Sequence, residues 1–537
     1  MSKVHEIIEM HNYLDTTKRT LATEFQEIVD YVLPDRSNVQ RWESPGQRRG
    51  TVRYDSTAVE AAEILAGNLA ATLTPQASVW FQLVTKNPQL RQMKKVVDWC
   101  QEVRDLMLGA MSTSNFYLAM DEVYLDLVGF GTAAPYAEML NGRLHYQCWP
   151  IKDYVFTVGI DGRANAIYRK FKMTAEQVFN RFSRHPGKKE LGDIVTAAMS
   201  STADAQASQR EIEVIHCIAP REKYTPGKPG FQNMPIESVY VNVDDRVIMA
   251  EGGYEEMPVS IARWRVTSDD AGWGRGPGST SMPDVRSLNA AKRMIHRAAA
   301  KDLDPPLIIE DRGVIGSVRT TPNGITYKRK GAEVDYLTSG SRMDLGIFDV
   351  QELKSQIRSV FYADHLRMPP PQGTPMTATE TQIRWELMER LLGPTLGRVM
   401  TELLNPGVER TFGLMMRTGQ LPEPPQEMME EEIDIEYQGP LARAQKQPEI
   451  AAIERTFAAA AGLDQMTQSN AATMRLNPDE AVKILARLHG FPADGLRDDD
   501  EIAAMQQQQQ EAMAAQQERQ DAALAADMAG KVQGAAA

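Results

Sequence analysis

The sequence predicts an α+β protein that is mainly helical, and three observations indicate this fold class. Apolar residues recur every three to four positions through most of residues 1–128, as they do in helices with one buried face. β-branched and aromatic residues dominate short segments within 143–265, as they do in half-buried strands. Helical spacing returns after residue 281 and is interrupted by a compact segment with strand character at 307–345.

The N-terminal part is predicted to be helical, with one polar loop. Helical spacing of apolar residues continues from Ile7 until Pro34. The polar stretch 36–53 contains Pro45 and Gly46 and is therefore predicted to be a loop. Further helices are predicted at 55–74, 89–112 and 116–128.

A β-hairpin and further strands are predicted next. Residues 153–159 and 164–172 are rich in β-branched and aromatic side chains, and Asp161-Gly162 between them is a hairpin turn signal. Thr174 and Gln177 have the spacing of a capping box that begins a helix. More strands are predicted at 211–219, 236–243 and 246–250. The first 265 residues are therefore interpreted as one mixed domain.

Glycine occupies every second position from Gly272 to Gly278. A phosphate-binding loop would continue into Gly-Lys-Ser or Gly-Lys-Thr, and neither follows here. A dinucleotide site would need a βαβ unit, which the pattern does not predict. We therefore interpret the segment as a flexible hinge.

Two helices of similar length are predicted on either side of the small β module. The first has Ser281 and Asp284 at its N-terminus and ends near residue 304, before two prolines. The second begins at Asp349, with Glu352 as its capping-box partner, and runs to about residue 366. Short strands are predicted between them at 307–310, 314–319 and 325–330.

A proline-rich loop and a long helix follow. Four prolines lie within 369–375, so this segment can be neither helix nor central strand. The long helix begins at Thr377 and is predicted to kink at Pro394. A second break is predicted at Pro406-Gly407, and Gly419 marks the end. Ala-rich helices are predicted near 448–461 and 478–489, before a low-complexity tail at 501–537.

Composition argues against several classes of protein. The chain has 537 residues, with 59 Lys and Arg against 72 Asp and Glu, so its formal net charge is −13. This balance argues against a protein that holds nucleic acid over its whole surface.

Three widely spaced cysteines form neither a disulfide framework nor a zinc cluster. The N-terminus lacks the apolar segment of a signal peptide, and the apolar stretch 61–73 is too short to span a bilayer, so we expect synthesis in the cytosol.

Catalytic motifs are absent from the sequence. It contains no H-E-x-x-H, G-x-S-x-G, Walker A or EF-hand pattern. The eight histidines are scattered, and each is more readily explained by packing or surface exposure than by metal binding. Paired carboxylates such as Glu255-Glu256 are expected to be solvated. We therefore predict no catalytic residue, no metal site and no cofactor.

The informative feature is a set of basic residues around the β module. In the first flanking helix, four basic side chains are spaced by seven, four and four residues, so they share one face. The second helix carries a pair, and the module carries a third group. A solvent-exposed helix face would explain one such stripe. Three basic groups around one module of an acidic protein instead favour a local concentration of positive charge that serves a function. The candidates are Arg286, Arg293, Arg297, Lys301, Lys354 and Arg358 in the helices, and Lys328, Arg329 and Lys330 in the module.

The order of elements, together with several motifs, resembles the portal, or head-to-tail connector, proteins of short-tailed bacteriophages. The matching segments are 154–168 around Asp161-Gly162, Gly253-Tyr254 with Pro258, Arg263-Trp264, 274–278, and 375–381. The resemblance covers roughly residues 1–490. It implies a portal-type fold and a structural role without catalysis.

The same resemblance implies how such a protein works. Twelve copies would form a ring at one capsid vertex of the virion, and double-stranded DNA would enter and leave through it. The implied partners are the terminase, the tail adaptor, the major capsid protein, and scaffolding or internal core proteins, with no small-molecule substrate. The basic helix residues would line the DNA channel or, alternatively, contact neighbouring subunits, and the sequence leaves both open.

A division of the chain is also implied by the resemblance. The wing would comprise 1–281 and 376–440, the two stem helices 282–306 and 346–366, the clip 307–345, the tunnel loop 367–375, the crown 441–500 and the tail 501–537. The tunnel loop would be formed by Pro369, Pro370, Pro371, Gln372, Gly373 and Thr374.

Two other functions agree with parts of the sequence. A capsid scaffolding or tail-adaptor protein is the main alternative, and the Ala/Gln/Met tail supports it. Scaffolds are mostly helical, however, whereas 143–265 and 307–345 demand β structure. A nuclease or terminase subunit would need clustered metal-binding carboxylates, and the sequence shows no convincing set.

Overall fold

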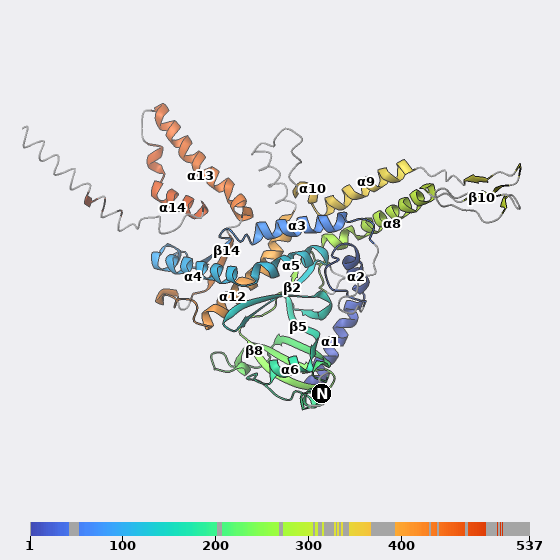
Figure 1. Cartoon of the computed structure of the whole chain (residues 1–537). Helices are drawn as coiled ribbons and strands as arrows, with labels where there is room; N and C mark the ends of the chain where they lie inside the picture. Colours follow the sequence, from blue (N-terminus) through green and yellow to red (C-terminus); the bar gives the residue numbers. More distant parts are fainter. Residues whose placement is uncertain are drawn as a thin grey trace, which may run out of the picture. The chain divides into compact units, whose positions relative to one another are not determined.

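The structure is a computed structural model, and it confirms the mixed α+β class. It describes residues 2–41, 53–200, 207–267, 272–303, 343–366, 392–428, 431–437, 440–467 and 471–489, with short pieces between 307 and 336 and four positions between 502 and 508. The chain divides into two compact units (Figure 1). The first comprises 1–76 and 109–420, and the second comprises 77–108 and 421–537.

The predicted N-terminal helices are present in the first unit. Apolar side chains at helical spacing give α1 (Lys3–Arg19) and α2 (Ala22–Tyr31), and α2 ends just before Pro34. They are followed by α3 (Thr57–Leu73) and α5 (Phe116–Gly129), which pack against each other. The predicted loop is described only up to residue 41 and from residue 53.

A three-stranded antiparallel sheet follows α5. Its order is β3 (Arg143–Trp149), β2 (Thr132–Leu140) and β9 (Ala262–Arg263). The sequence analysis placed the change to strands near residue 143 and so missed β2. The β2–β3 turn is Asn141-Gly142, and both residues have positive φ, 50° and 77°. An Asn-Gly pair is a strong hairpin signal, so this turn could have revealed β2.

A five-stranded antiparallel meander confirms the remaining strand predictions. Its order is that of the chain: β4 (Tyr154–Val158), β5 (Ala164–Thr174), β6 (Glu211–Pro220), β7 (Ile236–Asn242) and β8 (Val247–Tyr254). Gly162 has a φ of 75° in the predicted β4–β5 turn. Thr174 and Gln177 form the predicted capping box at the start of α6 (Ala175–Phe182).

Helices cover both faces of this sheet. Successive residues of a strand point to opposite faces, so Val214 and Ile215 belong to different cores. Ile215 packs with Ile7 of α1, whereas Val214 packs with α6 and with α7 (Asp193–Ser200). The sheet therefore forms the middle layer of a three-layer body, visible in the lower part of Figure 1.

The glycine-rich segment packs closely against the body, so its interpretation as a flexible hinge is wrong for residues 272–278. A Cβ on Gly274 would lie 2.1 Å from the carbonyl oxygen of Gly131, and one on Gly278 would lie 2.4 Å from that of Gly129. Trp273 is buried and contacts the rings of Tyr154 and Phe156. These glycines allow close backbone contact with the end of α5, and no phosphate-binding loop is formed.

The two helices around the β module both start earlier than predicted. The first is α8 (Pro277–Leu303), in which Pro277 occupies the first turn, where its missing N–H is tolerated. Ser281 lies inside this helix and donates its hydroxyl to the Gly278 carbonyl, so it is not the cap. The second is α9 (Met343–Val360), followed by α10 (Ala363–Leu366). Asp349 lies in the interior of α9 and is likewise not a cap.

The β module contains two strand pairs. The first joins β10 (Leu307–Ile309) to β13 (Val334–Tyr336), and the second joins β11 (Val314–Ile315) to β12 (Tyr327–Lys328). Strands were predicted at the positions of β10, β11 and β12, but no strand was predicted at β13.

The long helix crosses Pro406 without a break, which corrects the predicted interruption there. Helical residues are described from 392, so the start at Thr377 and the kink at Pro394 stay predictions. A π-helical turn, η5 (Met400–Leu404), leads into α12 (Asn405–Arg417). Pro406 cannot donate a backbone hydrogen bond, and a widened turn before it accommodates the mismatch. Gly419, with a φ of 68°, ends the helix as predicted.

The second unit joins two segments that are distant in sequence. Its sheet pairs β1 (Phe81–Thr85) with β14 (Ile433–Tyr437), and neither strand was predicted. The Ala-rich helices are confirmed as α13 (Pro440–Thr467) and α14 (Pro478–His489). Asp464 accepts hydrogen bonds from the backbone N–H groups of Ala472 and Thr473, which hold the turn between them. The helix α4 (Lys94–Thr113) confirms a further prediction.

Single-turn 3-10 helices complete the described structure. They are η1 (Leu90–Gln92), η2 (Ile151–Asp153), η3 (Ala207–Gln209), η4 (Phe231–Asn233), η6 (Gln426–Met428) and η7 (Thr473–Arg475).

Candidate functional site: helices α8 and α9 and their ion pairs

Residue chemistry gives no sign of a catalytic centre. Within the described part of the chain, no group of three or more His, Cys, Asp or Glu side chains could hold a metal ion. The three cysteines are buried, and burial raises the pKa of Cys100 to about 11 and that of Cys217 to about 12. Their thiols are therefore protonated and poorly nucleophilic at neutral pH. Among the described helices, none is long and apolar enough to cross a membrane.

A buried histidine in the five-stranded sheet has a packing role. His216 is buried, its ring stacks on Tyr240 with centroids 3.9 Å apart, and its Nε2 lies 2.9 Å from the hydroxyl of Ser238. Burial holds the pKa of His216 well below its usual value. A neutral, stacked imidazole of this kind supports the core of the sheet.

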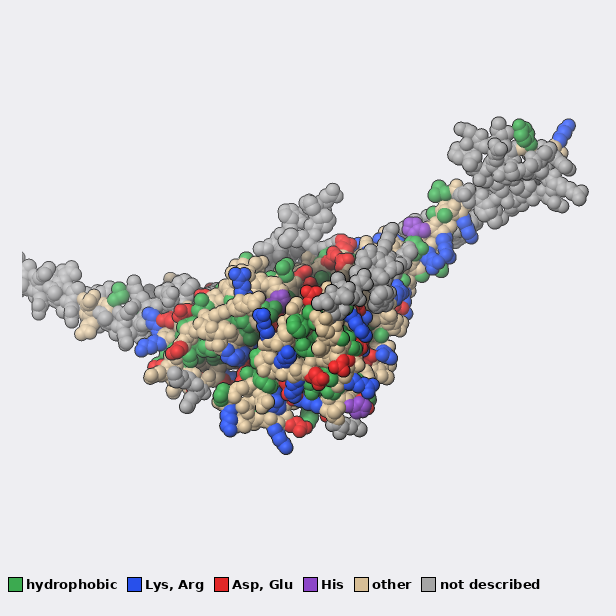
Figure 2. Space-filling view, turned by 60° about the horizontal axis from the view of Figure 1, so that its bottom comes forward, with side chains coloured by type: hydrophobic (Ala, Val, Ile, Leu, Met, Phe, Trp, Pro, Cys, Tyr) green, Lys and Arg blue, Asp and Glu red, His purple; other side chains and the backbone are tan. Residues whose placement is uncertain are grey.

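The basic stripe predicted on the first flanking helix lies on one exposed face of α8. Arg286, Arg293, Arg297 and Lys301 are all exposed, while Leu288 on another face is buried. Figure 2 shows Lys and Arg side chains along the part of the molecule that α8 and α9 form. All four residues are thus exposed on α8, and their place in a DNA channel stays a prediction.

The members of this stripe differ in their partners. Arg286 pairs with Glu27 of α2 at 3.0 Å, so it fastens the beginning of α8 to the body. Arg293, Arg297 and Lys301 form no ion pair within the described residues. Three of the four side chains are thus left to meet something outside the described chain.

Lys354 of α9 is an anchor and not a free surface charge. Its Nζ lies 3.3 Å from Oδ2 of Asp55, and Nζ of Lys292 from α8 lies 2.6 Å from the same oxygen. One carboxylate just before α3 therefore holds both α8 and α9. Arg358, the second predicted residue of α9, is half-buried.

Asp55 is itself held in place by the polar groups around it. The side-chain oxygen of Asn289 accepts hydrogen bonds from the backbone N–H groups of Tyr54 and Asp55, at 3.0 and 3.3 Å. Asp55 also accepts the backbone N–H of Thr57, the first residue of α3, at 2.7 Å. Burial opposes its ionisation, but Lys292, Thr57 and Lys354 outweigh burial and lower the pKa of Asp55 to about 2.

Asp55, Asn289 and Lys292 are not among the site residues that the sequence pattern predicts. Asn289 and Lys292 lie three residues apart in α8; Asn289 is buried although it lies four residues before Arg293, in line with the stripe, and Lys292 is half-buried. Their partner lies more than 230 residues earlier in the chain. The only local signal was a polar pair beside the buried Leu288, on a face where polar side chains need partners.

The other predicted site residues are described only in part. Lys328 belongs to β12 and Lys330 is exposed, whereas Arg329 lies outside the described residues. The tunnel-loop residues, from Pro369 to Thr374, also lie outside the described residues.

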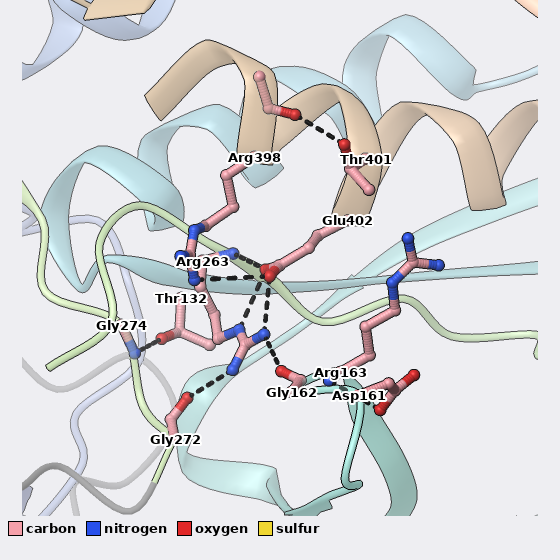
Figure 3. Close-up of polar contacts among 11 residues, drawn as sticks. Thr132, Asp161, Gly162, Arg163, Arg263, Gly272, Gly274, Arg398, Thr401 and Glu402 are labelled. Carbon is pink, nitrogen blue, oxygen red and sulfur yellow. Dashed lines mark hydrogen bonds and ion pairs between the residues drawn. The ribbon is translucent and has the colours of Figure 1, made fainter. Parts of the chain in front are cut away.

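A buried ion pair joins several of the motifs on which the resemblance rests. Arg263 is 2% exposed, and its guanidinium binds both carboxylate oxygens of Glu402 in η5, at 2.7 and 3.0 Å (Figure 3). The same guanidinium donates to the carbonyls of Gly162 and Gly272. The β4–β5 hairpin, the strand β9, the glycine-rich segment and the long helix therefore meet at one arginine.

A second ion pair corrects the expectation for Glu255-Glu256. Glu256 is half-buried and binds Arg410 at 2.9 Å and Arg417 at 2.5 Å, so it is paired and not simply solvated. Arg410 also lies over the ring of Tyr254, with its guanidinium carbon 5.2 Å from the ring centroid. The Gly253-Tyr254 motif is thereby fixed to α12.

Comparison with known proteins places these features in a family. Residues 4–496 match the family described as bacteriophage head to tail connecting protein. The chain is 30% identical over 443 residues to the "Probable portal protein" of Bordetella phage BPP-1, covering 81% of this chain and 78% of the relative. It is 27% identical over 453 residues to the "Portal protein" of Salmonella phage epsilon15, covering 82% and 79%. The chain belongs to the bacteriophage head to tail connecting protein family, which is structural and not enzymatic, as the sequence analysis predicted.

Proposed function

We propose that copies of this chain form a ring at one vertex of a phage head, and that viral DNA passes through the ring during packaging and ejection. Family membership over 4–496 and the two relatives named as portal proteins support this role. In this proposal the ring has twelve copies, and it docks the terminase and later the tail adaptor. The major capsid protein and scaffolding or internal core proteins surround it, and the chain is made in the host cytoplasm.

The structural observation that carries the proposal is the exposure of the stem. From residue 290 to 303 of α8, no residue is buried within its own chain. Met294 is 69% exposed and Leu303 is 87% exposed. Large apolar side chains that project from a helix pair into water are unfavourable. We therefore expect other subunits to cover this part of the stem in the assembled particle.

A ring of such stems has a suitable bore. A helix is about 10 Å wide, so twelve in a circle need a circumference of about 120 Å and a radius of about 19 Å to their axes. Half a helix width on each side leaves a bore of roughly 28 Å. Duplex DNA is roughly 20 Å across, so it would pass without contact to every subunit at once.

We extend the proposal to the parts of the chain. The wing comprises 1–281 and 376–440, the stem 282–306 and 346–366, the clip 307–345, the tunnel loop 367–375, the crown 441–500 and the tail 501–537. The anchors described above then join the stem to the wing, because Asp55 belongs to the wing and Lys292 and Lys354 belong to the stem. The formal net charge of −13 per chain favours sliding of DNA over tight binding.

The candidate channel residues are divided by the structure into two kinds. Arg286 and Lys354 are engaged in ion pairs within the chain. Arg293, Arg297 and Lys301 remain as candidates to meet either DNA phosphates or a neighbouring subunit, together with the half-buried Arg358. Lys328, Arg329 and Lys330 remain candidates in the clip.

Electron microscopy of the purified full chain tests the proposal. We expect class averages with a central hole and rotational symmetry close to twelve-fold, and sedimentation of a species several hundred kilodaltons in mass, since one chain weighs 59.9 kDa. A monomer or a rod with no ring at any concentration would overturn the portal role. The scaffolding alternative predicts that the protein leaves the head on maturation, so its retention in purified virions is the second readout.

A further inference from the structure

The stem has two outward faces of opposite character. The helices α8 and α9 pack side by side with their chains running in opposite directions. Each helix therefore has an inner side, which contacts its partner, and an outer side, which points away from the pair. The outer sides of α8 and α9 face in opposite directions. Their side chains can be compared directly.

The outward face of α8 is basic with one large apolar side chain. Residues 291, 295, 298 and 299 are half-buried on the side toward α9. At about 100° per residue, Arg293, Met294 and Arg297 lie on the other side. All three are exposed, and Met294 is 69% exposed.

The outward face of α9 is acidic, also with one large apolar side chain. Val350 and Ile357 are buried on the inner side. Glu352 is exposed on the outer side, and Asp349 is exposed at its edge, about 90° around the helix from Val350 and Ile357. Neither forms an ion pair within the described residues, although Glu352 accepts a hydrogen bond from Gln356. Phe348 is 72% exposed and lies on the same outer side.

The shared carboxylate of Asp55 fixes the heights of these residues along the stem. Because Lys292 and Lys354 bind one oxygen atom, they lie at nearly the same level. Five residues beyond Lys292 is Arg297, and five residues before Lys354 is Asp349, so these two also share a level. Because lysine side chains are long, the levels of Arg297 and Asp349 along the helix pair agree to within one helical turn, ~5 Å.

We infer that the outward face of α8 docks on the outward face of α9 of the next copy in the ring, with Arg297 opposite Asp349 and Arg293 near Glu352. This inference rests on the proposed ring. In a closed ring each subunit meets its two neighbours through two different surfaces, related by rotation without a shift along the axis. Residues at the same level within one stem are therefore also at the same level in adjacent stems.

Two observations favour a neighbouring copy over DNA as the partner of the stripe. Phosphates would satisfy Arg293 and Arg297 but would leave Met294 and Phe348 in water, whereas the next stem covers both apolar side chains. DNA would also leave the acidic face of α9 without a partner. A second copy satisfies both faces at once, with complementary charge and at matched height.

Cysteine cross-linking tests the contact directly. In a variant with Arg297→Cys and Asp349→Cys, the two positions of one chain lie on opposite sides of the helix pair, roughly 15 Å or more apart. A short bismaleimide can therefore join them only between subunits, and the native cysteines are buried. We expect a ladder of covalent oligomers on denaturing gels, and single-cysteine variants should give no ladder. Intact rings without a ladder would overturn the inference.

A charge exchange provides the second test. Arg297→Asp and Asp349→Arg, each alone, should raise the concentration needed for half-assembly at least about tenfold, because each places like charges together. The double variant has the wild-type net charge and should return to within about threefold of wild type. If both single variants assemble like wild type, or if the double variant assembles no better than they do, the docking inference is wrong.

The outcomes also separate this inference from the proposed function. Normal rings in both single variants with loss of DNA packaging would show that the stripe meets DNA, which overturns the docking inference and leaves the portal role intact. Failure of the wild-type chain to form any ring would instead count against the portal role itself.

Discussion

Arg263 and Glu402 form a buried pair in which the guanidinium contacts both carboxylate oxygens, and the backbone N–H of Arg263 donates to the same carboxylate at 3.1 Å. The two residues lie 139 positions apart. Glu402 belongs to a π-helical turn, and Arg263 also binds the carbonyls of Gly162 and Gly272. A single side chain thus fixes a hairpin, a loop and the long helix relative to one another.

Removal of the charge from Glu402 should destabilise the first unit strongly. Glu402→Gln keeps the shape but leaves a buried guanidinium without its counter-ion, and breaking a buried pair costs about 3–5 kcal/mol. Thermal unfolding monitored by circular dichroism should show a clear fall in midpoint. Arg398→Ala is the matched control, because Arg398 is more exposed and lies 3.6 Å from the same carboxylate. A fall in the control as large as that in Glu402→Gln would contradict the assignment.

The glycine-rich segment makes a second prediction, because it packs closely against α5. Gly274→Ala places a Cβ 2.1 Å from the Gly131 carbonyl oxygen, so the backbone must shift. We expect a loss of at least about 2 kcal/mol in unfolding free energy. Gly67→Ala in α3 is the control, since its Cβ meets no atom within 4 Å, and it should stabilise the helix by about 0.5–1 kcal/mol. Equal behaviour of the two variants would restore the hinge interpretation.

Local patterns predicted much of this fold. Helical spacing up to Pro34, the Asp161-Gly162 turn and the Thr174–Gln177 capping box are each decided by a few adjacent residues, and all three are confirmed. The failures involve distant partners. The strands β1 and β14 pair across about 350 residues, and an acidic alternation in β14 gives little β signal by itself.

The candidate site was predicted less well, for a related reason. The spacing of Arg293 and Arg297 along a helix is readable in sequence, whereas the pairing of Lys354 with Asp55 depends on how three helices pack. The starts of α8 and α9 were misplaced because Ser281 and Asp349 look like caps in sequence. A cap is defined by where the backbone leaves the helix, and neighbouring residues continued the helix through both positions.

The ion pairs of Asp55 should control how firmly α8 and α9 are attached to the rest of the first unit. Asp55→Asn removes the charge that Lys292 and Lys354 share, and we expect a loss of about 1–3 kcal/mol. Hydrogen exchange should rise around Lys292 in α8 and around Lys354 in α9, and stay unchanged in the five-stranded sheet. Glu27→Gln is a comparison that loosens only the Arg286 contact. A uniform rise over both regions would show global destabilisation and contradict a local anchor.

The pH dependence of this anchor follows from the pKa of Asp55. That pKa is lowered to about 2 in the folded chain from 3.8, so the folded state binds the proton less readily than the unfolded state. The contribution of Asp55 is therefore fully present above pH 3.8 and is lost as the pH falls toward 2. The difference in stability between wild type and Asp55→Asn should shrink over that window, and a constant difference would contradict the assignment.

Lys18 makes the last prediction, because it is a buried lysine bound to backbone carbonyls. Its Nζ donates to the carbonyls of Ile151, Lys152 and Tyr154, which fastens α1 to the start of β4. Burial lowers the pKa of Lys18 to about 8, from 10.5, and the nearby carboxylates of Asp15 and Asp153 only partly oppose this effect. The unfolded chain therefore binds more protons than the folded chain between pH 8 and 10.5, and the contribution of Lys18 to the unfolding free energy rises with pH across that window.

The matched variant is Lys18→Met, which keeps the length of the side chain and removes the donors and the titration. It should be less stable than wild type at pH 7 by about 1–3 kcal/mol, because three carbonyls lose a hydrogen-bond partner. Unfolding of both proteins at several pH values gives the difference between them, in which the titration of all other groups cancels. That difference should be constant between pH 6 and 7.5 and should grow between pH 8 and 10.5, by an amount of the order of 3 kcal/mol. A difference that falls as the pH rises would mean that charged Lys18 is favoured in the folded chain, and would reverse the sign argued for its burial.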